Sequence, residues 1–493
     1  MGRPDAAETA RLTDAVNRVL PALERFLRYE GEDRAARDRD TWRAALDVAL
    51  PRTGVGTDAM LDMLARWVIP YGLRNGAPGF AGWITTSPTT GPAVSAFAAA
   101  IAGSQRWWVQ PFNHLETVAL GWLAELLGIP ASWQGTFTSG GSAANLVALG
   151  AARQHAFERL GVDPSRDGLP AQQRWRVYAS SEVHHVVTRA AAVVGLGRRS
   201  VAMLDVDDIG RLRPAALERA LRDDRAKGIH PVAIVATAGT VNTGAIDPIR
   251  EIADIADEHG VWLHVDGAYG LFGRLDERVA PLYEGLERAG SIAVDPHKWL
   301  AVPLGCGATY VRDRAVMGRA FTLEPAEYLE GAASTGPLQS PFDEFGDLFH
   351  DFNLEQSAQS RGVTVWAALA EMGSEGMRER VRRHDDFARH LADRVRADDR
   401  LELLAPPTLS ITCFRYRGDV RDEAALDALN NDVARALRAE TPFVPSTTRV
   451  RGHLAIRPCY VNPRTTLAEV DGLANAVRHI GDRLASRAMT PAE

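Results

Sequence analysis

Residues 291–300 read SIAVDPHKWL, an apolar run that leads directly into Lys298. The amine of Lys298 stands between His297 and Trp299, after a stretch that is typical of a buried strand. A lysine in this setting suits a covalent bond, as a Schiff base, to the aldehyde of a pyridoxal cofactor. The alternative is a packing lysine whose aliphatic stem covers apolar surface. Three further segments bear on this choice.

The segment HVDGAYG at 264–270 follows the apolar residues EHGVWL and predicts a buried parallel strand that ends in a turn. A carboxylate at this strand end, Asp266, would keep a pyridine nitrogen protonated and so strengthen the ring as an electron sink. Ala268 is small enough for a flat ring to lie beside it. Asp-Gly is also common in turns and helix caps, so Asp266 alone leaves both interpretations open.

A glycine-rich turn lies in FTSGGSAANLVALGAAR at 137–153, where a short strand-like stretch leads into an Ala/Leu helix. Its glycines let backbone N–H groups approach an anion, its serines add hydroxyl donors, and the helix dipole favours negative charge. The pattern predicts a phosphate cradle, with a plain tight turn as the alternative. It matches neither GxGxxG nor GxxxxGKS/T, which disfavours an ordinary nucleotide-binding loop.

The third segment, SSEVHHVVTRAAAVVGLG at 180–197, places His184 at the expected start of a helix with an apolar face. Its ring would stack on a flat heteroaromatic cofactor and hydrogen-bond a substrate carboxylate or carbonyl. His185 is the competing candidate, and a solvated or packing histidine is the alternative for either. No His/Cys/Asp/Glu set repeats at zinc-ligand spacing, so we expect no metal.

Strand-like and helical segments alternate from about residue 71 to 375, which is typical of βαβ units and a mostly parallel sheet. Active residues then fall at the carboxyl ends of the strands. Amphipathic spacing over 5–30 predicts a helical N-terminal arm within residues 1–70. A helical run at 377–397 and two strand-like segments that flank a further helix predict a smaller α+β domain over 376–493. The expected strands and that helix are RVYAS, PVAIVATAG, VWLHVDG, SIAVDP, RLELLAPPTLSITCFRYRG, HLAIRPCYVNP and DEAALDALNNDVARALRAE.

Composition limits the classes of protein that this chain fits. Its 493 residues exceed the ~250–300 at which one core stops growing, so at least two structural regions are expected. A formal net charge of −7 gives no basic field for nucleic acid. Three widely spaced cysteines fit a reducing cytosol, and the N-terminus has no signal-peptide core. The longest apolar stretch, 93–103, is too short to span a bilayer. We expect a cytoplasmic protein that binds neither nucleic acid nor membrane.

Five segments, taken in chain order, resemble the signature segments of the pyridoxal-phosphate group II amino-acid decarboxylases: TSGGSAAN, SSEVHHVV, ATAGTVNTGAID, HVDGAYG and DPHKWL. That family includes aromatic-L-amino-acid, tyrosine, tryptophan and glutamate decarboxylases, and the resemblance runs from about Ala77 to Arg464. It implies an α/β fold of the fold type I transferase-like kind, with helices on both faces of the central sheet. It also implies a homodimer whose active sites lie at the interface.

The resemblance assigns four residues to the ring of pyridoxal 5'-phosphate. Lys298 would form the covalent bond to the cofactor, and Asp266 would pair with the pyridine nitrogen. Ala268 would lie against one face of the ring, and His184 would stack on the other. These implied roles agree with the chemistry of the residues themselves.

The same resemblance assigns the remaining cofactor contacts. Gly141, Ser142 and His297 would hold the phosphate, with the backbone of Asp295 nearby. Thr240 would contact the phenolic side of the cofactor. Outside the family context, Thr240 is an ordinary turn residue.

One residue bears on the type of reaction. Tyr328 lies in EPAEYLEGAASTGP at 324–337, a Gly, Ser and Pro rich segment without clear periodicity. The resemblance implies that a tyrosine here favours simple decarboxylation by returning a proton to Cα, whereas phenylalanine accompanies oxidative deamination. A phenol can donate a proton and a phenyl ring cannot. The alternative is a surface tyrosine on a loop.

The substrate end departs from the family pattern. Ala143 stands where relatives usually carry Glu, the PAxTELE segment is shortened to PFNHLE at 111–116, and HPxFF becomes APGFAGW at 77–83. Arg361 is the residue that matches a basic stretch of the relatives, and its role is open. Aromatic side chains near these segments would line an aromatic pocket, with interface packing as the alternative. These candidates are Phe80, Trp83, Trp107 and Trp108.

These observations predict a carboxy-lyase that converts an L-amino acid to its amine and carbon dioxide. Aromatic substrates are favoured over acidic ones because Trp and Phe crowd the expected pocket. One alternative is aldehyde synthesis or transamination on the same scaffold, and Tyr328 disfavours the aldehyde route. The other is a catalytically silent scaffold protein. Product analysis separates these alternatives.

Overall fold

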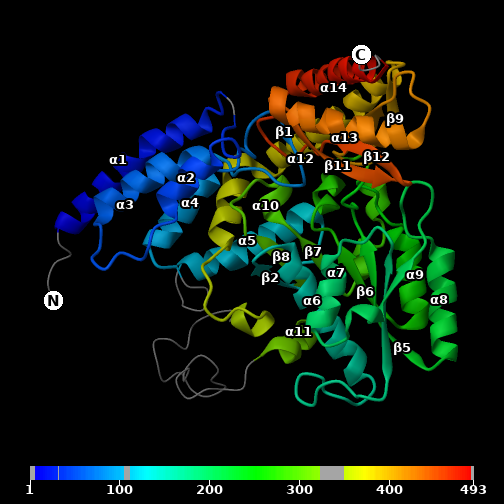
Figure 1. The fold of residues 1–493 in the computed structure, drawn as a ribbon. Coiled ribbons are helices and arrows are strands. Elements are labelled where there is room, and N and C mark those ends of the chain that lie inside the picture. The colour runs from blue at the N-terminus through cyan, green and yellow to red at the C-terminus, as the bar shows by residue number, and fades with distance from the viewer. Residues whose placement is uncertain (1–5, 32, 105–110, 323–348, 490–493) are drawn as a thin grey trace.

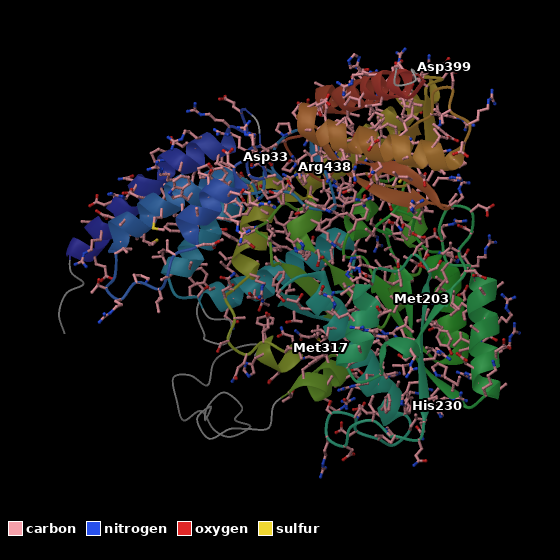
Figure 2. All side chains as sticks on the ribbon, viewed as in Figure 1. Asp33, Met203, His230, Met317, Asp399 and Arg438 are labelled. Atoms are coloured by element: carbon pink, nitrogen blue, oxygen red, sulfur yellow. The ribbon has the colours of Figure 1, made fainter. Side chains whose placement is uncertain are left out.

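The computed structural model describes residues 6–31, 33–104, 111–322 and 349–489. Two sheets organise the described chain, and each has its own hydrophobic cluster. Figure 1 shows the larger sheet in the lower part of the molecule, the smaller one above it, and the N-terminal helices to one side. Charged side chains such as Asp33, Asp399 and Arg438 are exposed on the outside (Figure 2), whereas Met317 is fully buried.

The larger sheet has seven strands in the order β2-β8-β7-β6-β5-β3-β4. The pairs from β7 through β6, β5 and β3 to β4 are parallel, and β8 pairs antiparallel with both β2 and β7. Every residue of β2, β6, β7 and β8 is buried, which requires helices on both faces of the sheet. The strands are β2 (Gln134–Thr138), β3 (Arg174–Ser180), β4 (Val201–Leu204), β5 (Ile229–Thr237), β6 (Trp262–Asp266), β7 (Ser291–Val294) and β8 (Gly307–Val311).

Helices connect and cover these strands. α6 follows β2 and packs along β5, β6, β7 and β8, while α8 and α9 pack on β5 and α9 also contacts β6. α9 ends at a glycine with positive φ, Gly260, which closes the helix before β6 begins. The helices are α5 (Pro111–Leu127), α6 (Gly141–Glu158), α7 (Val186–Val193), α8 (Pro214–Ala226), α9 (Ile249–His259), α10 (Pro296–Trp299) and α11 (Arg314–Phe321).

The smaller sheet has the order β1-β11-β12-β10-β9, and α13 and α14 pack against it. Long helix α12 leads into it and is interrupted at Gly373, where φ is 67°. β1 pairs parallel with β11, so residues near 80 join a sheet formed mainly by the C-terminal part of the chain. The elements are β1 (Phe80–Ala81), α12 (Gly362–Arg396), β9 (Leu401–Ala405), β10 (Cys413–Tyr416), α13 (Glu423–Glu440), β11 (Val444–Val450), β12 (His453–Arg457) and α14 (Leu467–Met489).

The first four α-helices, α1 to α4, lie to one side of the body in Figure 1. α1 matches the helix expected over 5–30 and contacts α3, while α4 packs on α12. The bounds are α1 (Ala6–Leu27), α2 (Arg39–Leu46), α3 (Thr57–Met63) and α4 (Thr90–Ile101). None of the described helices combines the length and the apolar character that a bilayer crossing requires.

The expected α/β class with a mostly parallel sheet is confirmed, as are the strands at RVYAS, PVAIVATAG, VWLHVDG and SIAVDP. The sequence did not predict β11 or the pairing of β1 with it. A two-residue strand has no periodicity of its own, and its partner lies more than 360 residues further along the chain. The cysteines Cys306, Cys413 and Cys459 are buried and free.

Candidate active site

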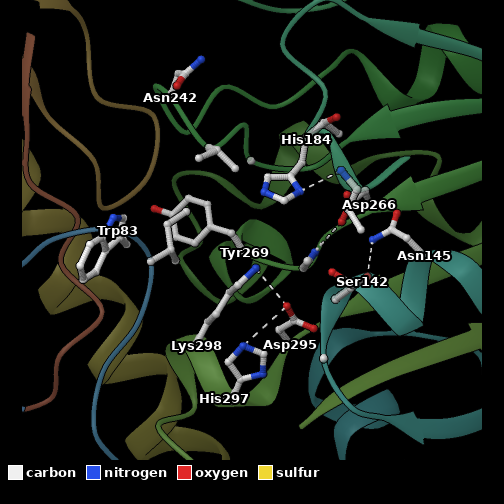
Figure 3. Close-up of a pocket in the computed structure, with 18 of the residues that line it drawn as sticks. Trp83, Ser142, Asn145, His184, Asn242, Asp266, Tyr269, Asp295, His297 and Lys298 are labelled. Carbon is white, nitrogen blue, oxygen red and sulfur yellow. Dashed lines mark hydrogen bonds and ion pairs between the residues drawn. The ribbon is translucent and has the colours of Figure 1, made fainter. Parts of the chain in front are cut away.

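A cavity of about 500 Å³ opens at the carboxyl ends of β5, β6 and β7, between the two sheets (Figure 3). This is the edge at which parallel α/β sheets bind ligands. Segments that are distant in sequence converge here, including β11 and β12 of the smaller sheet. Of the residues predicted for the site, the lining includes Trp83, Gly141, Ser142, His184, Asp266, Ala268, Asp295, His297 and Lys298.

Lys298 is held by the short helix α10, which begins directly after β7 and Asp295. Its amine lies 3.0 Å from Asp295 Oδ2. The next residue, Trp299, is fully buried, stacks on Tyr269 at 5.3 Å between ring centroids, and donates its indole N–H to His384 at 2.9 Å. This anchoring fixes the backbone of Lys298 while its side chain extends into the cavity (Figure 3).

Asp266 is the last residue of β6 and is nearly buried. Its Oδ1 accepts the backbone N–H of Ala268 at 3.1 Å, which orients the carboxylate at the start of the following turn. Ala268 lines the same cavity. A buried carboxylate in this position is suited to pair with a protonated ring nitrogen.

Of the two neighbouring histidines, His184 lines the cavity, whereas His185 is exposed. The backbone N–H of Val186 donates to His184 Nδ1 at 3.3 Å. Burial lowers the pKa of His184, and His185 acts in the same direction. Asp266 opposes this shift by raising the pKa of the ring. A half-buried, neutral imidazole is suited to lie against a flat aromatic ring.

The expected phosphate cradle lies where β2 ends and α6 begins. Gly140 precedes α6 with φ of 125°, a conformation that favours glycine. A Cβ added at Gly141 would lie 2.6 Å from Asp295 Oδ2, so only glycine fits there. His297 Nδ1 lies 2.7 Å from the carbonyl oxygen of Cys306, which turns its other nitrogen toward the cradle side, 3.9 Å from Asp295 Oδ2.

Some predicted residues lie outside the cavity lining or outside the described residues. Thr240 is fully buried outside the cavity lining, and its hydroxyl accepts the N–H of Ala245 and bonds the hydroxyl of Thr243. Phe80 is buried 6.0 Å from the ring of Trp83. Their contacts with a cofactor or substrate stay predictions. Trp107, Trp108 and Tyr328 lie outside the described residues.

Arg361 does not line the cavity, and its side chain bonds to other parts of the protein. It pairs with Glu355 at 2.7 Å and donates to the carbonyl oxygen of Gly305 at 2.9 Å. Within the described part of the chain, no group of three or more His, Cys, Asp or Glu side chains is arranged to hold a metal ion.

Sequence reasoning missed several lining residues: Asn145, Thr237, Asn242, Ser446, Thr448 and Arg457. Thr237 ends β5 in the segment PVAIVATAG, so its place at a strand end was available as a signal. Asn145 lies one turn into α6, after the glycine-rich turn. Arg457 ends β12, and no local pattern places that strand over the cavity.

A sequence model of the family described as "Pyridoxal-dependent decarboxylase conserved domain" matches residues 95–417. The chain belongs to this family. An aromatic-L-amino-acid decarboxylase of Bacillus atrophaeus is 30% identical, with 88% of this chain and 87% of that protein covered. An L-2,4-diaminobutyrate decarboxylase of Rhizobium meliloti (strain 1021) is 32% identical, with 87% and 83% covered. The protein is therefore a pyridoxal-phosphate-dependent carboxy-lyase that acts on an amino acid.

Solved structures share the fold of this family member. The crystal structure of Oryza sativa TDC with PLP and tryptamine superposes with a TM-score of 0.85 at 24% identity, covering 98% of this chain and all of that one (100%). Mouse CSAD superposes with a TM-score of 0.84, also at 24% identity, over 96% and 99% of the two chains. At these identities the likeness establishes the fold.

The residues present fit pyridoxal phosphate. The cavity joins an amine, a buried carboxylate, a neutral imidazole and a glycine cradle at a helix N-terminus. Two buried oxygens, Thr237 Oγ1 and Asp295 Oδ1, have no hydrogen-bond partner among the described residues. Both residues border the cavity, and such atoms are costly unless a ligand or water satisfies them.

Proposed function

We propose that this protein decarboxylates an L-amino acid with an aromatic side chain and releases the amine and carbon dioxide. The observation that carries the proposal is the indole of Trp83, which borders the cavity on which Lys298, Asp266 and His184 converge. The family establishes decarboxylation of an amino acid, and the choice of side chain is the proposed step.

The roles of the site residues follow from their chemistry. Pyridoxal phosphate supplies an aldehyde that bonds to amines and a ring that draws electrons from bonds at Cα. Lys298 would provide the amine that holds the aldehyde. Asp266 would keep a proton on the ring nitrogen, and His184 would pack against the ring. Gly141 and Ser142 would bind the phosphate at the N-terminus of α6.

Trp83 supports an aromatic substrate. It borders the cavity, remains 57% exposed, and has a φ of 49°, which is unusual for a side chain of this size. Ser446 accepts its backbone N–H, and Arg457 donates to its carbonyl oxygen at 2.9 Å. The indole is thus presented at the cavity by contacts from the smaller sheet, where it can pack against an aromatic side chain.

Arg457 favours a second candidate, an acidic amino acid such as glutamate. Its side chain is almost wholly buried and lines the cavity. Its hydrogen bonds within the described chain go to the backbone carbonyl oxygens of Trp83, Val241 and Asn242. A buried guanidinium held only by carbonyls can still pair with a substrate carboxylate.

A substrate comparison tests the proposal. Cofactor-loaded protein is given each of the twenty L-amino acids and L-2,4-diaminobutyrate, while carbon dioxide and amine are measured. We expect the highest kcat/KM with tryptophan, tyrosine or phenylalanine, and Trp83→Ala should lower it by about tenfold or more. Preference for glutamate, lost in Arg457→Gln and retained in Trp83→Ala, would replace the aromatic assignment with the acidic one.

We further propose that Tyr328 returns the proton to Cα after carbon dioxide has left. Its phenol can donate a proton, and phenylalanine at this position cannot. Tyr328→Phe should shift the products from amine toward aldehyde, ammonia and hydrogen peroxide in the presence of oxygen. An unchanged amine yield would remove Tyr328 from the reaction.

We propose a homodimer with active sites at its interface. Several large apolar side chains on helices α1 and α4 are exposed, as expected of a surface that a second copy covers. They are Leu12, Leu20, Leu23, Val94, Phe97 and Ile101. In sedimentation velocity, Phe97→Glu should yield monomers, and Val193→Glu on α7, also an exposed apolar position, should leave the dimer intact. A monomeric wild-type protein would refute the proposal.

A further inference from the structure

His264 joins the two ends of the site through buried hydrogen bonds. It is fully buried on β6, two residues before Asp266, so the two side chains share one face of the strand. Its Nε2 lies 3.0 Å from Asn145 Oδ1 on α6, and its Nδ1 lies 3.0 Å from Ser291 Oγ on β7. Three separate elements therefore meet at one imidazole.

The partners on either side fix the direction of each hydrogen bond. Asn145 Nδ2 donates to the carbonyl oxygen of Gly141 at 2.9 Å, so its Oδ1 faces His264 and needs a donor. His264 must therefore carry its proton on Nε2. On the other side, Trp262 Nε1 donates to Ser291 Oγ at 2.9 Å, which leaves the serine hydrogen for Nδ1 of His264 at 3.0 Å. The carbonyl oxygen of Ser291 lies further from Nδ1, at 3.3 Å, and is the weaker of its two contacts. The series runs in one direction from Trp262 to Gly141.

The series ends at the phosphate cradle. Gly141 is the first residue of α6, and Asn145 lies beside Ser142 and Asp266 in the cavity (Figure 3). The imidazole thus connects the strand that carries the proposed ring partner to the turn that carries the proposed phosphate ligands. A leucine or valine would fill this core position without imposing any orientation on Asn145.

We propose that His264, held as the Nε2-protonated neutral form, is a positioning residue that fixes the first turn of α6 relative to Asp266, and so aligns the phosphate cradle with the ring site. The inference rests on the proposed assignment of Gly141 and Ser142 to the phosphate. Burial lowers the pKa of His264 to about 4, which keeps the ring neutral at pH 7.

The test compares affinity for pyridoxal phosphate with affinity for pyridoxal, which lacks the phosphate. Both are measured by absorbance and fluorescence titration of cofactor-free protein, and the ratio of the two affinities reports on the cradle alone. His264→Asn is too short to reach Asn145, whereas His264→Gln places an amide nitrogen near the position of Nε2. Asn145→Ala removes the next member of the series.

We expect His264→Asn and Asn145→Ala each to lower the affinity ratio by about tenfold, and His264→Gln to restore most of it. The double variant of His264→Asn with Asn145→Ala should lose no more than either single variant, because both break the same connection. The unfolding midpoint of each cofactor-free variant is measured alongside. If His264→Asn fails to fold, Asn145→Ala and His264→Gln carry the comparison.

Equal losses of affinity for pyridoxal phosphate and pyridoxal would overturn the proposal, since His264 would then act only in packing. An unchanged ratio in Asn145→Ala would overturn it as well. Ser142→Ala tests the underlying assignment separately. If Ser142→Ala leaves the ratio unchanged while the His264 and Asn145 variants lower it, the phosphate assignment of Ser142 is wrong and the positioning role stands.

Discussion

The amine of Lys298 lies 3.0 Å from the carboxylate of Asp295, three residues earlier in the chain. Asp295 is buried, and its other oxygen has no partner among the described residues. The pair holds the lysine at the rim of the phosphate cradle, since the same carboxylate lies next to Gly141. If Gly141 and Ser142 bind the phosphate as proposed, the pair of Lys298 and Asp295 would hold the amine within reach of the cofactor's aldehyde.

Covalent attachment at Lys298 can be tested without ambiguity, because the chain contains only two lysines, Lys227 and Lys298. Lys227 is exposed directly after α8 and is not among the residues that line the cavity. Borohydride reduction of the cofactor-loaded protein, followed by peptide mass mapping, should place the label on the peptide that contains Lys298.

Two variants complete that experiment. Lys227→Arg should keep both the label and the activity, and Lys298→Ala should lose the label, the visible absorbance of the bound cofactor and turnover. A label on Lys227 in the wild type, or turnover by Lys298→Ala, would refute the assignment.

Space in the cradle gives a second prediction. In Gly141→Ala the new Cβ would lie 2.6 Å from Asp295 Oδ2 and 3.3 Å from the Cβ of Ala268. Asp295 is buried and paired with Lys298, so it cannot move away freely. We expect a loss of about 1–3 kcal/mol of stability and at least tenfold weaker binding of pyridoxal phosphate.

The matched control is Gly121→Ala on α5, where a Cβ would meet nothing within 4 Å. A helical glycine replaced by alanine should gain about 0.5–1 kcal/mol with unchanged cofactor affinity. Calorimetry and cofactor titration measure both quantities. Tight cofactor binding by Gly141→Ala would show that the cradle is wider than the structure indicates.

The depressed pKa of His264 gives a prediction for pH. Burial lowers this pKa to about 4, against an ordinary value of 6.5, with the charge of Asp266 opposing the shift. Between these two values the unfolded chain binds a proton that the folded protein excludes. Stability contributed by the neutral ring is therefore complete above about pH 6.5 and is lost as the pH falls toward 4. The whole interval corresponds to roughly 3 kcal/mol.

Urea unfolding of the wild type and of His264→Gln at several pH values isolates this contribution. The difference between their unfolding free energies should change by about 1–3 kcal/mol between pH 7 and pH 4.5, with the wild type losing more. Other titrating groups cancel in the comparison. A constant difference across this range would mean that His264 titrates alike in the folded and unfolded states.

The sequence predicted those parts of the fold and site that depend on short segments. Asp266 and Lys298 each end or follow a buried apolar run, and a parallel sheet brings its strand ends to one edge. The glycine-rich turn at Gly141 can be recognised in the sequence because the conformation at Gly140 and the contact at Gly141 exclude side chains. Local chemistry was sufficient for these residues.

Other parts depend on contacts that no local pattern encodes. Trp83 reaches the cavity through Ser446, 363 residues away in sequence, and His264 meets Asn145 across 119 residues. Arg457 enters the site because β12 lies over it, which depends on packing between the two sheets. For Thr240 the local motif pointed to a cofactor contact, but in the structure its hydroxyl bonds within its own turn.

Asp385 on α12 provides the last prediction. It is fully buried, and neither carboxyl oxygen has a hydrogen bond of normal geometry among the described residues. Burial raises the pKa of Asp385 well above its ordinary value of 3.8, an effect that Arg389 opposes and Asp276 reinforces. The folded protein therefore holds a neutral acid where the unfolded chain ionises, and stability falls as the pH rises above about 4.

Asp385→Asn replaces that acid with an amide that cannot ionise and can still donate a hydrogen bond toward Asp276. We expect the variant to be more stable than the wild type by about 1–3 kcal/mol at pH 7, with the advantage shrinking toward pH 4. Asp399→Asn, at an exposed carboxylate (Figure 2), should change the unfolding free energy by less than about 0.5 kcal/mol at either pH. The opposite result would be a stability of Asp385→Asn, relative to the wild type, that is lower at pH 7 than at pH 4. It would show that the carboxyl of Asp385 is ionised and paired in the folded protein.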